Sequence, residues 1–128
     1  MDRLFVAVGA LNGFFAVVMG AFGAHALRGE IPDTLLRAFE TSAQYQGIHA
    51  LALIAVGILL NFRESRCLVA AGWALLAGVL LFCGSLYGMA LSGTRALGAL
   101  TPLGGIGFLA GWLLFAVGAW RGTARSTR

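Results

Sequence analysis

The stretch CLVAAGWALLAGVLLFCGSLYGMAL, residues 67–91, decides the fold of this chain because it contains no acidic or basic side chain. A helix needs about 20 apolar residues to cross the hydrocarbon core of a bilayer, which is about 30 Å thick. Three more runs of this kind lie at residues 4–27, 46–62 and 102–120. A soluble chain of 128 residues could not bury four such runs. The sequence therefore predicts an all-α integral membrane bundle of four transmembrane helices, forming a single domain over residues 1–128.

Composition supports this class and excludes others. Hydrophobic residues make up 59% of the chain, and charged residues make up only 11%, too few for the surface of a soluble domain. The net charge is +4, but the basic residues stand at the ends of the four runs and form no patch. We therefore expect no nucleic-acid partner.

Glycine is abundant, with 19 residues in the chain, most of them inside the four runs. Glycine disfavours a helix in water, but in lipid its small size lets two helix backbones approach closely. In the first run the small residues recur at steps of three and four, which keeps them on one side of a helix. The glycines expected at helix–helix contacts are Gly9, Gly13, Gly20, Gly23, Gly84, Gly88, Gly104, Gly107 and Gly111.

Residues 28–45 are expected to form a turn followed by an amphipathic helix. Gly29 and Pro32 break the first helix, and residues 34–45 then carry apolar and polar side chains on different faces. A helix of this kind can lie in the membrane interface with its apolar face in lipid. We therefore expect an interfacial helical segment at about residues 33–45, before the second span. Since only Gly47 interrupts the pattern, one bent helix over residues 33–62 is the alternative.

The distribution of arginine predicts the orientation, because cytoplasmic loops are enriched in basic residues. The side of the bundle that holds both termini carries Arg3, Arg63, Arg66, Arg121, Arg125 and Arg128, and the opposite side carries Arg28, Arg37 and Arg95. We therefore expect both termini to be cytoplasmic, with the first and third loops facing outward.

This topology is expected to gather polar side chains toward the outer end of the bundle. The second span is taken to begin at residue 46, so His49 is expected about one helical turn inside that end, and the central region is expected to be apolar apart from Asn12. Ionisable residues inside a membrane are costly, which makes them candidates for function. The candidate outer-side pocket consists of His25, Glu40, Gln44, Tyr45, His49, Ser85, Tyr87 and Thr101.

Three interpretations of this cluster stay open: a hydrogen-bond network that holds the helices together, a pocket for a small ligand or lipid headgroup, and a metal or haem site through His25 and His49. A zinc site takes four ligands, and the sequence offers no obvious third. Haem would need space that tight packing at glycine denies. We therefore expect neither a metal nor a cofactor.

The chain shows no motif for catalysis, so we expect it not to be an enzyme. Two function classes remain: a non-enzymatic accessory protein that binds lipid or a small ligand, and a small transporter or channel. The apolar central region favours the first, since transporters bind substrates near the middle of the membrane. Glycine stripes on several spans exceed the needs of one bundle, so we expect a homo-oligomer or a larger membrane complex, surrounded by membrane lipids.

Several short segments carry a family resemblance. They are GAFGAHAL at residues 20–27, ETSAQYQGIHAL at residues 40–51, FCGSLY at residues 82–87, TPLGG at residues 101–105 and GW at residues 111–112. In this order and spacing they resemble the YgdD/YwdK-like family of small bacterial inner-membrane proteins, the domain of unknown function 423. The resemblance implies four spans in a bacterial inner membrane. It implies no activity, and therefore no catalytic residues.

Overall fold

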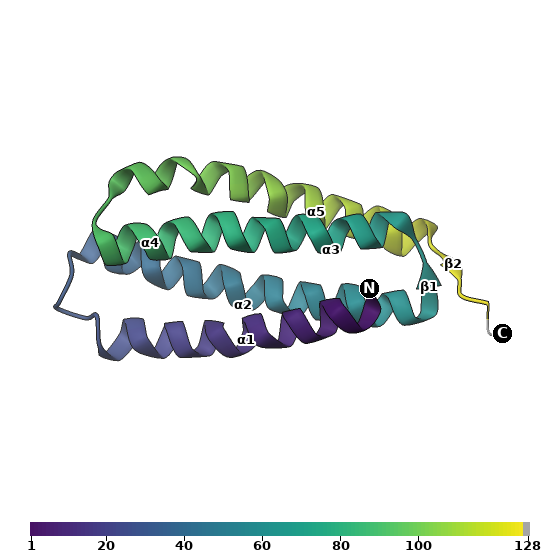
Figure 1. Ribbon diagram of the computed structural model, residues 1–128, viewed down its shortest axis with the longest axis horizontal. Helices are drawn as coiled ribbons and strands as arrows, with labels where there is room; N and C mark the ends of the chain where they lie inside the picture. The colour runs from purple at the N-terminus through teal and green to yellow at the C-terminus, as the bar shows by residue number, and fades with distance from the viewer. Residues whose placement is uncertain (127–128) are drawn as a thin grey trace.

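The computed structural model describes residues 1–126, and over these it is a bundle of long helices that run side by side (Figure 1). Two short strands and two helical turns complete it. The elements are α1 (Asp2–His25), α2 (Asp33–Phe62), β1 (Arg63–Glu64), α3 (Arg66–Gly78), η1 (Val79–Cys83), α4 (Gly84–Ser92), η2 (Arg95–Ala99), α5 (Thr101–Arg121) and β2 (Thr123–Ala124).

Four helical stretches are long and apolar enough to cross a membrane, which confirms the predicted fold class. They are α1, α2, the combined helix over Arg66–Ser92 and the combined helix over Arg95–Arg121. The third stretch is continuous through α3, η1 and α4, but it contains a π-helical turn at η1. A π-helical turn inside an α-helix adds a local irregularity and is often found at functional positions.

The segment 33–45 is the first part of α2 and forms no separate interfacial helix. Its apolar residues Leu35, Leu36 and Phe39 are buried in one cluster with Leu27 and Ala90. The expected interfacial segment therefore directs its apolar face at the neighbouring helices instead of at lipid. The structure agrees with the alternative prediction of one helix over residues 33–62.

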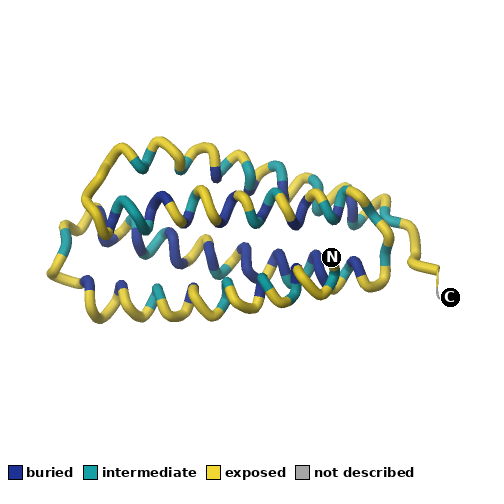
Figure 2. Tube along the Cα trace, in the orientation of Figure 1, coloured by how far each residue is buried: buried dark blue, intermediate teal, exposed yellow. Residues whose placement is uncertain are grey.

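The core runs along the axis of the bundle, where large apolar side chains meet. Phe5, Leu53, Leu68 and Leu75 are fully buried, and Phe108 is nearly so. Figure 2 shows the buried residues on the inner sides of the helices and exposed residues along the outer sides of α1 and α5. In its apolar window, α1 has only 11% of its residues buried, against 44% for α2. The central helix of the bundle is therefore α2.

Several of the predicted glycines do stand at tight helix–helix contacts. A Cβ atom built on Gly9 would lie 2.8 Å from the carbonyl oxygen of Ala50, and one on Gly111 would lie 2.7 Å from the side chain of Leu75. Any side chain there would force the helices apart. Close contacts of this kind are found at Gly9, Gly23, Gly104, Gly107 and Gly111, whereas a Cβ atom on Gly88 would meet only Cδ1 of Leu97 in η2, at 3.0 Å.

Three predicted glycine contacts are wrong within the bundle. Gly20 and Gly84 have open space where a Cβ atom would be, and Gly13 would make only one ordinary contact, at 3.9 Å. Gly84 is exposed, whereas Gly13 and Gly20 border hollows between α1 and α2 where the two helices are not in tight contact. Four further glycines, which lie outside the predicted set, also make close contacts: Gly57, Gly72, Gly78 and Gly118.

Both termini lie at one end of the bundle, where β1 pairs with β2 (Figure 1). The two strands are antiparallel, with Arg63 opposite Ala124. Arg125 adds a hydrogen bond to the carbonyl oxygen of Leu60, at 3.0 Å, and an ion pair with Asp2, at 3.7 Å. The first helix, the second loop and the segment after α5 are therefore held together.

Candidate functional site: a polar network beside an aromatic groove

The buried polar side chains of α2 (Ser42, Gln46 and His49) lie toward the middle of the bundle. At 1.5 Å per residue, His49 is about 24 Å from the start of α2 and about 20 Å from its end. The expectation that His49 lies one turn inside the outer end is wrong, because α2 begins at Asp33 instead of near residue 46. Asn12 and Trp112 likewise lie near the middle of α1 and α5. The predicted apolar centre therefore contains a polar layer.

One chain of hydrogen bonds in this layer joins three helices. The Tyr87 hydroxyl of α4 donates to Oε1 of Gln46 in α2, at 2.7 Å. Nε2 of Gln46 donates to Oδ1 of Asn12 in α1, at 3.1 Å, and Nδ2 of Asn12 donates to the carbonyl oxygen of Val8, at 2.9 Å. Each member is a donor to the next, so the orientations of the three side chains are fixed together.

A second set of bonds joins α2 to α5 through His49, which is only 3% exposed. Its Nδ1 lies 2.6 Å from the carbonyl oxygen of Tyr45, and its Nε2 lies 3.1 Å from Nε1 of Trp112. An indole nitrogen can only donate, so Nε2 of His49 accepts and the ring proton is on Nδ1. The imidazole is neutral in this arrangement, and both of its nitrogens are used.

A third link lies where the π-helical turn η1 ends. The Ser42 hydroxyl donates to the carbonyl oxygen of Cys83, at 3.0 Å, and the Cys83 thiol donates to the carbonyl oxygen of Ser42, at 3.4 Å. Both residues are buried. The pair therefore attaches the irregular turn of the third span to α2 at the level of the polar layer.

An aromatic groove lies beside this layer, between α2, η1 and α5. Tyr45 stacks on Phe82 with ring centroids 4.7 Å apart, and His49 stacks on Phe108 at 3.6 Å. The groove has a volume of about 510 Å³. Its lining residues are Tyr45, Ile48, His49, Phe82, Pro102, Gly105, Ile106, Phe108, Leu109 and Trp112.

The groove opens at the lateral surface of the bundle, away from its long axis, where Ile106 and Leu109 are exposed. Tyr45 brings the only hydroxyl group among the lining residues and is 40% exposed. Within residues 1–126 this hydroxyl has no hydrogen-bond partner, whereas the polar atoms of His49 and Trp112 are paired. The groove is therefore an apolar slot with one available polar group.

The structure brings together some of the predicted site residues and separates others. Tyr45 and His49 line the groove; Ser85 and Thr101 pair next to it, with their hydroxyl oxygens 2.7 Å apart. Tyr87 belongs to the network of Gln46. The remaining three lie elsewhere: His25 is exposed at the end of α1, and Glu40 and Gln44 border a separate hollow between α1 and α2.

A metal site through His25 and His49 is not formed, because they occupy different levels of the bundle and both ring nitrogens of His49 are engaged. Residues 1–126 contain no group of three or more side chains that could hold a metal ion. The important residues absent from the predicted site are Asn12, Ser42, Gln46, Cys83 and Trp112.

Comparison with known proteins places the chain in a family. The model of the protein family of unknown function DUF423 matches residues 19–105, which include the second helix, the π-helical turn and the start of α5. The chain belongs to the DUF423 family. It is 42% identical over 118 residues to the UPF0382 membrane protein YwdK of Bacillus subtilis (strain 168), covering 91% of this chain and 96% of the relative.

Two staphylococcal members of DUF423 are similar over almost their whole lengths. The UPF0382 membrane protein SAB0533 of Staphylococcus aureus (strain bovine RF122 / ET3-1) is 40% identical over 119 residues, covering 93% of this chain and 97% of the relative. SERP0230 of Staphylococcus epidermidis is 43% identical over 115 residues, covering 90% and 93%. No solved structure matches the chain. The protein is thus a multi-pass membrane protein with four candidate spans.

Proposed function

We propose that this DUF423 protein is a non-catalytic component of the bacterial inner membrane that binds a membrane lipid in the aromatic groove. The observation that carries the proposal is the slot of about 510 Å³ between α2, η1 and α5, with one unpaired hydroxyl, that of Tyr45, among its apolar walls. The adjacent polar network holds its walls in place.

The chemistry of the groove favours the acyl chain of a glycerophospholipid as its occupant. Aromatic side chains offer large apolar surfaces, and a tyrosine adds a polar group at one edge. The hydroxyl of Tyr45 can donate to an ester carbonyl, which has no hydrogen to give. A strongly polar solute would find no further unpaired partner among the lining residues. This supports an amphiphilic ligand that enters from the bilayer.

The filled axis of the bundle weighs against the alternative of a small transporter or channel. Phe5, Leu53 and Leu75 close the space between the helices along the axis. Every buried side-chain nitrogen and oxygen in residues 1–126 has a hydrogen-bond partner, so the polar layer offers no unpaired buried donor or acceptor to a solute. The depth of His49 is the one observation that favours transport. Flux of protons or small cations into liposomes that contain the protein would support that alternative.

We further propose that both termini are cytoplasmic and that copies of the protein associate. The end with both termini carries most of the arginines. Between α1 and α2, a hollow of about 560 Å³ is lined in part by the small residues Gly13, Ala16 and Gly47. A helix of a second copy can approach closely there. A monomeric mass in nanodiscs would contradict this association.

Filling the groove tests the lipid proposal directly. Gly105 lines the groove and has open space where a Cβ atom would be, so Gly105→Phe should occupy the slot without disturbing the helix contacts. The matched control is Gly84→Phe, at an exposed glycine that also has open space and does not line the groove.

The measurement is the melting temperature in delipidated detergent as a diacyl phospholipid is added. We expect a saturable rise for the wild type and for Gly84→Phe, and none for Gly105→Phe. A saturable rise of the same size in Gly105→Phe would contradict the proposal.

A further inference from the structure

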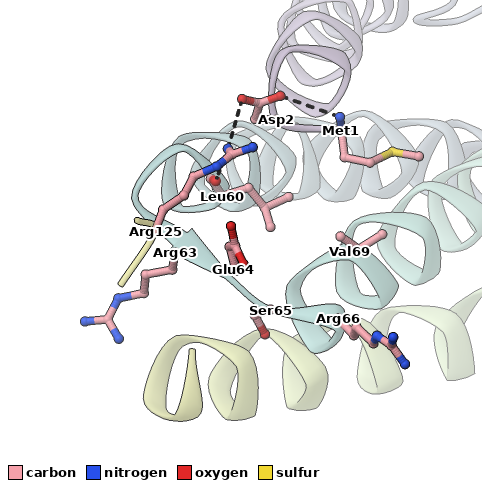
Figure 3. A pocket seen from close by; sticks show the side chains of 9 residues that line it. All are labelled: Met1, Asp2, Leu60, Arg63, Glu64, Ser65, Arg66, Val69 and Arg125. Carbon is pink, nitrogen blue, oxygen red and sulfur yellow. Dashed lines mark hydrogen bonds and ion pairs between the residues drawn. The ribbon is translucent and has the colours of Figure 1, made fainter. Parts of the chain in front are cut away.

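A pocket of about 350 Å³ lies at the end of the bundle that carries both termini, well away from the aromatic groove (Figure 3). It is lined by residues from the end of α2, strand β1 and the start of α3, together with Met1, Asp2 and Arg125. Leu60 and Val69 supply apolar wall. Since α2 ends and α3 begins here, the pocket lies at the level of lipid headgroups.

Most of the cations around this pocket already have partners. Arg125 pairs with Asp2, and the other carboxylate oxygen of Asp2 lies 3.5 Å from the terminal amine of Met1. Arg63 donates to the carbonyl oxygens of Ala119 and Gly122, at 3.2 and 3.0 Å. Figure 3 shows the Arg63 guanidinium turned away from the pocket. These three cations are engaged in holding the end of the bundle together.

Glu64 and Arg66 are the two charged residues of the pocket that remain unpaired. The ion pairs of residues 1–126 all involve Asp2, so Glu64 and Arg66 pair neither with each other nor with another described residue. They flank Ser65, whose hydroxyl accepts the backbone N–H of Leu68 and caps α3. The start of a helix favours an anionic group. The pocket therefore offers the Glu64 carboxylate for a cation, whereas the exposed Arg66 guanidinium, which Figure 3 shows extended away from the cavity at the start of α3, must turn inward to reach an anion.

We propose that this pocket binds the headgroup of a zwitterionic phospholipid that has a primary ammonium, a phosphatidylethanolamine. In this arrangement the phosphate binds Arg66 at the start of α3, and the ammonium donates to Glu64. The part of an acyl chain next to the headgroup packs against Leu60 and Val69. A choline headgroup has no N–H to donate to Glu64. A purely anionic headgroup leaves that carboxylate without a cation. The charge pattern therefore selects the ethanolamine headgroup among these three.

The test is native mass spectrometry of the detergent-solubilised protein with equal amounts of phosphatidylethanolamine, phosphatidylcholine and phosphatidylglycerol of one acyl composition. The wild type should retain phosphatidylethanolamine about threefold to tenfold above phosphatidylcholine, the size of one partly solvated charge-assisted hydrogen bond. Glu64→Gln should abolish this preference. Arg66→Gln should lower retention of all three lipids.

Matched controls exist at the opposite end of the bundle, where Glu30→Gln and Arg95→Gln change the same exposed residue types. Both should keep the wild-type preference. Equal retention of the ethanolamine and choline lipids by the wild type, a preference for phosphatidylglycerol, or an unchanged preference in Glu64→Gln would each overturn the proposal. The groove variant Gly105→Phe should keep the headgroup preference, so the two sites can fail independently.

Discussion

Trp112 donates its indole hydrogen to Nε2 of His49 across 3.1 Å, which joins the middle of α5 to the middle of α2. The bond requires a neutral imidazole with its proton on Nδ1, and that proton is directed at the carbonyl oxygen of Tyr45. A buried histidine with both nitrogens engaged acts as a cross-link between helices. These two hydrogen bonds account for the position of His49 deep in the bundle.

Removing the indole donor should destabilise the bundle. Trp112→Phe keeps an aromatic ring but leaves Nε2 of His49 without a partner, which should lower the free energy of unfolding by about 1–3 kcal/mol. Reversible unfolding in mixed micelles measures the change. Trp120→Phe is the control, because Trp120 is 89% exposed. Equal losses in the two variants would show that the bond to His49 contributes nothing.

The Tyr87–Gln46 bond should contribute a smaller amount. Tyr87→Phe removes one donor from the chain that ends at Asn12, and we expect a loss of about 0.5–1.5 kcal/mol in the same unfolding assay. Tyr45→Phe should cost less, since the Tyr45 hydroxyl has no partner in residues 1–126. In a Gln46→Leu background, Tyr87→Phe should add little, because the acceptor is already gone. An additive double variant would contradict the coupling.

Glycines should divide into two classes by their contacts. A Cβ atom on Gly57 would lie 2.6 Å from the carbonyl oxygen of Asp2, so Gly57→Leu should push α1 from α2 and lower the melting temperature. Gly84→Leu should leave the melting temperature of the monomer unchanged, because its Cβ atom would meet open space. The reverse order of the two melting temperatures would contradict the helix contacts described for α1 and α2.

The orientation can be checked with reporters. A fusion of a reporter that is active only in the periplasm, placed after Arg128, should be silent, and the same reporter inserted near Gly98 should be active. A reporter active only in the cytoplasm supplies the control and should give the opposite pattern at each position. Activity of the periplasmic reporter after Arg128 would place both termini outside and contradict the orientation predicted from the arginine distribution.

The sequence predicts the four spans well because hydropathy alone determines them. Hydropathy alone places the start of the second span near residue 46, since Arg37 and Glu40 lower the hydropathy of a helix that is continuous from Asp33; the alternative of one helix over residues 33–62 has the correct start. A different signal was present. The residues Phe39, Ser42, Gln46, His49, Leu53, Val56 and Leu60 follow a heptad pattern of alternating steps of three and four, and all of them are buried.

This heptad pattern predicts that Ser42 and Gln46 are buried and that Tyr45 lies at the edge of the buried face of α2. Trp112 and Cys83 could not be assigned in this way, because their partners depend on how α3 and α5 rotate against α2. The same holds for the glycines. Gly84 fits a close-packing motif, yet the π-helical turn just before it and the packing of α5 leave it facing outward. A small-residue pattern identifies a possible contact surface, whereas the neighbouring helix decides whether it is used.

The pairing of Arg63 with Ala124 also constrains the order of assembly. The two strands are separated in the chain by the third and fourth spans, so the ladder forms only after both of these have entered the membrane. Until then Arg63 lacks the carbonyl oxygens of Ala119 and Gly122, and Asp2 lacks Arg125. A nascent chain with three spans inserted is therefore open at this end, and it is the segment following α5 that closes it.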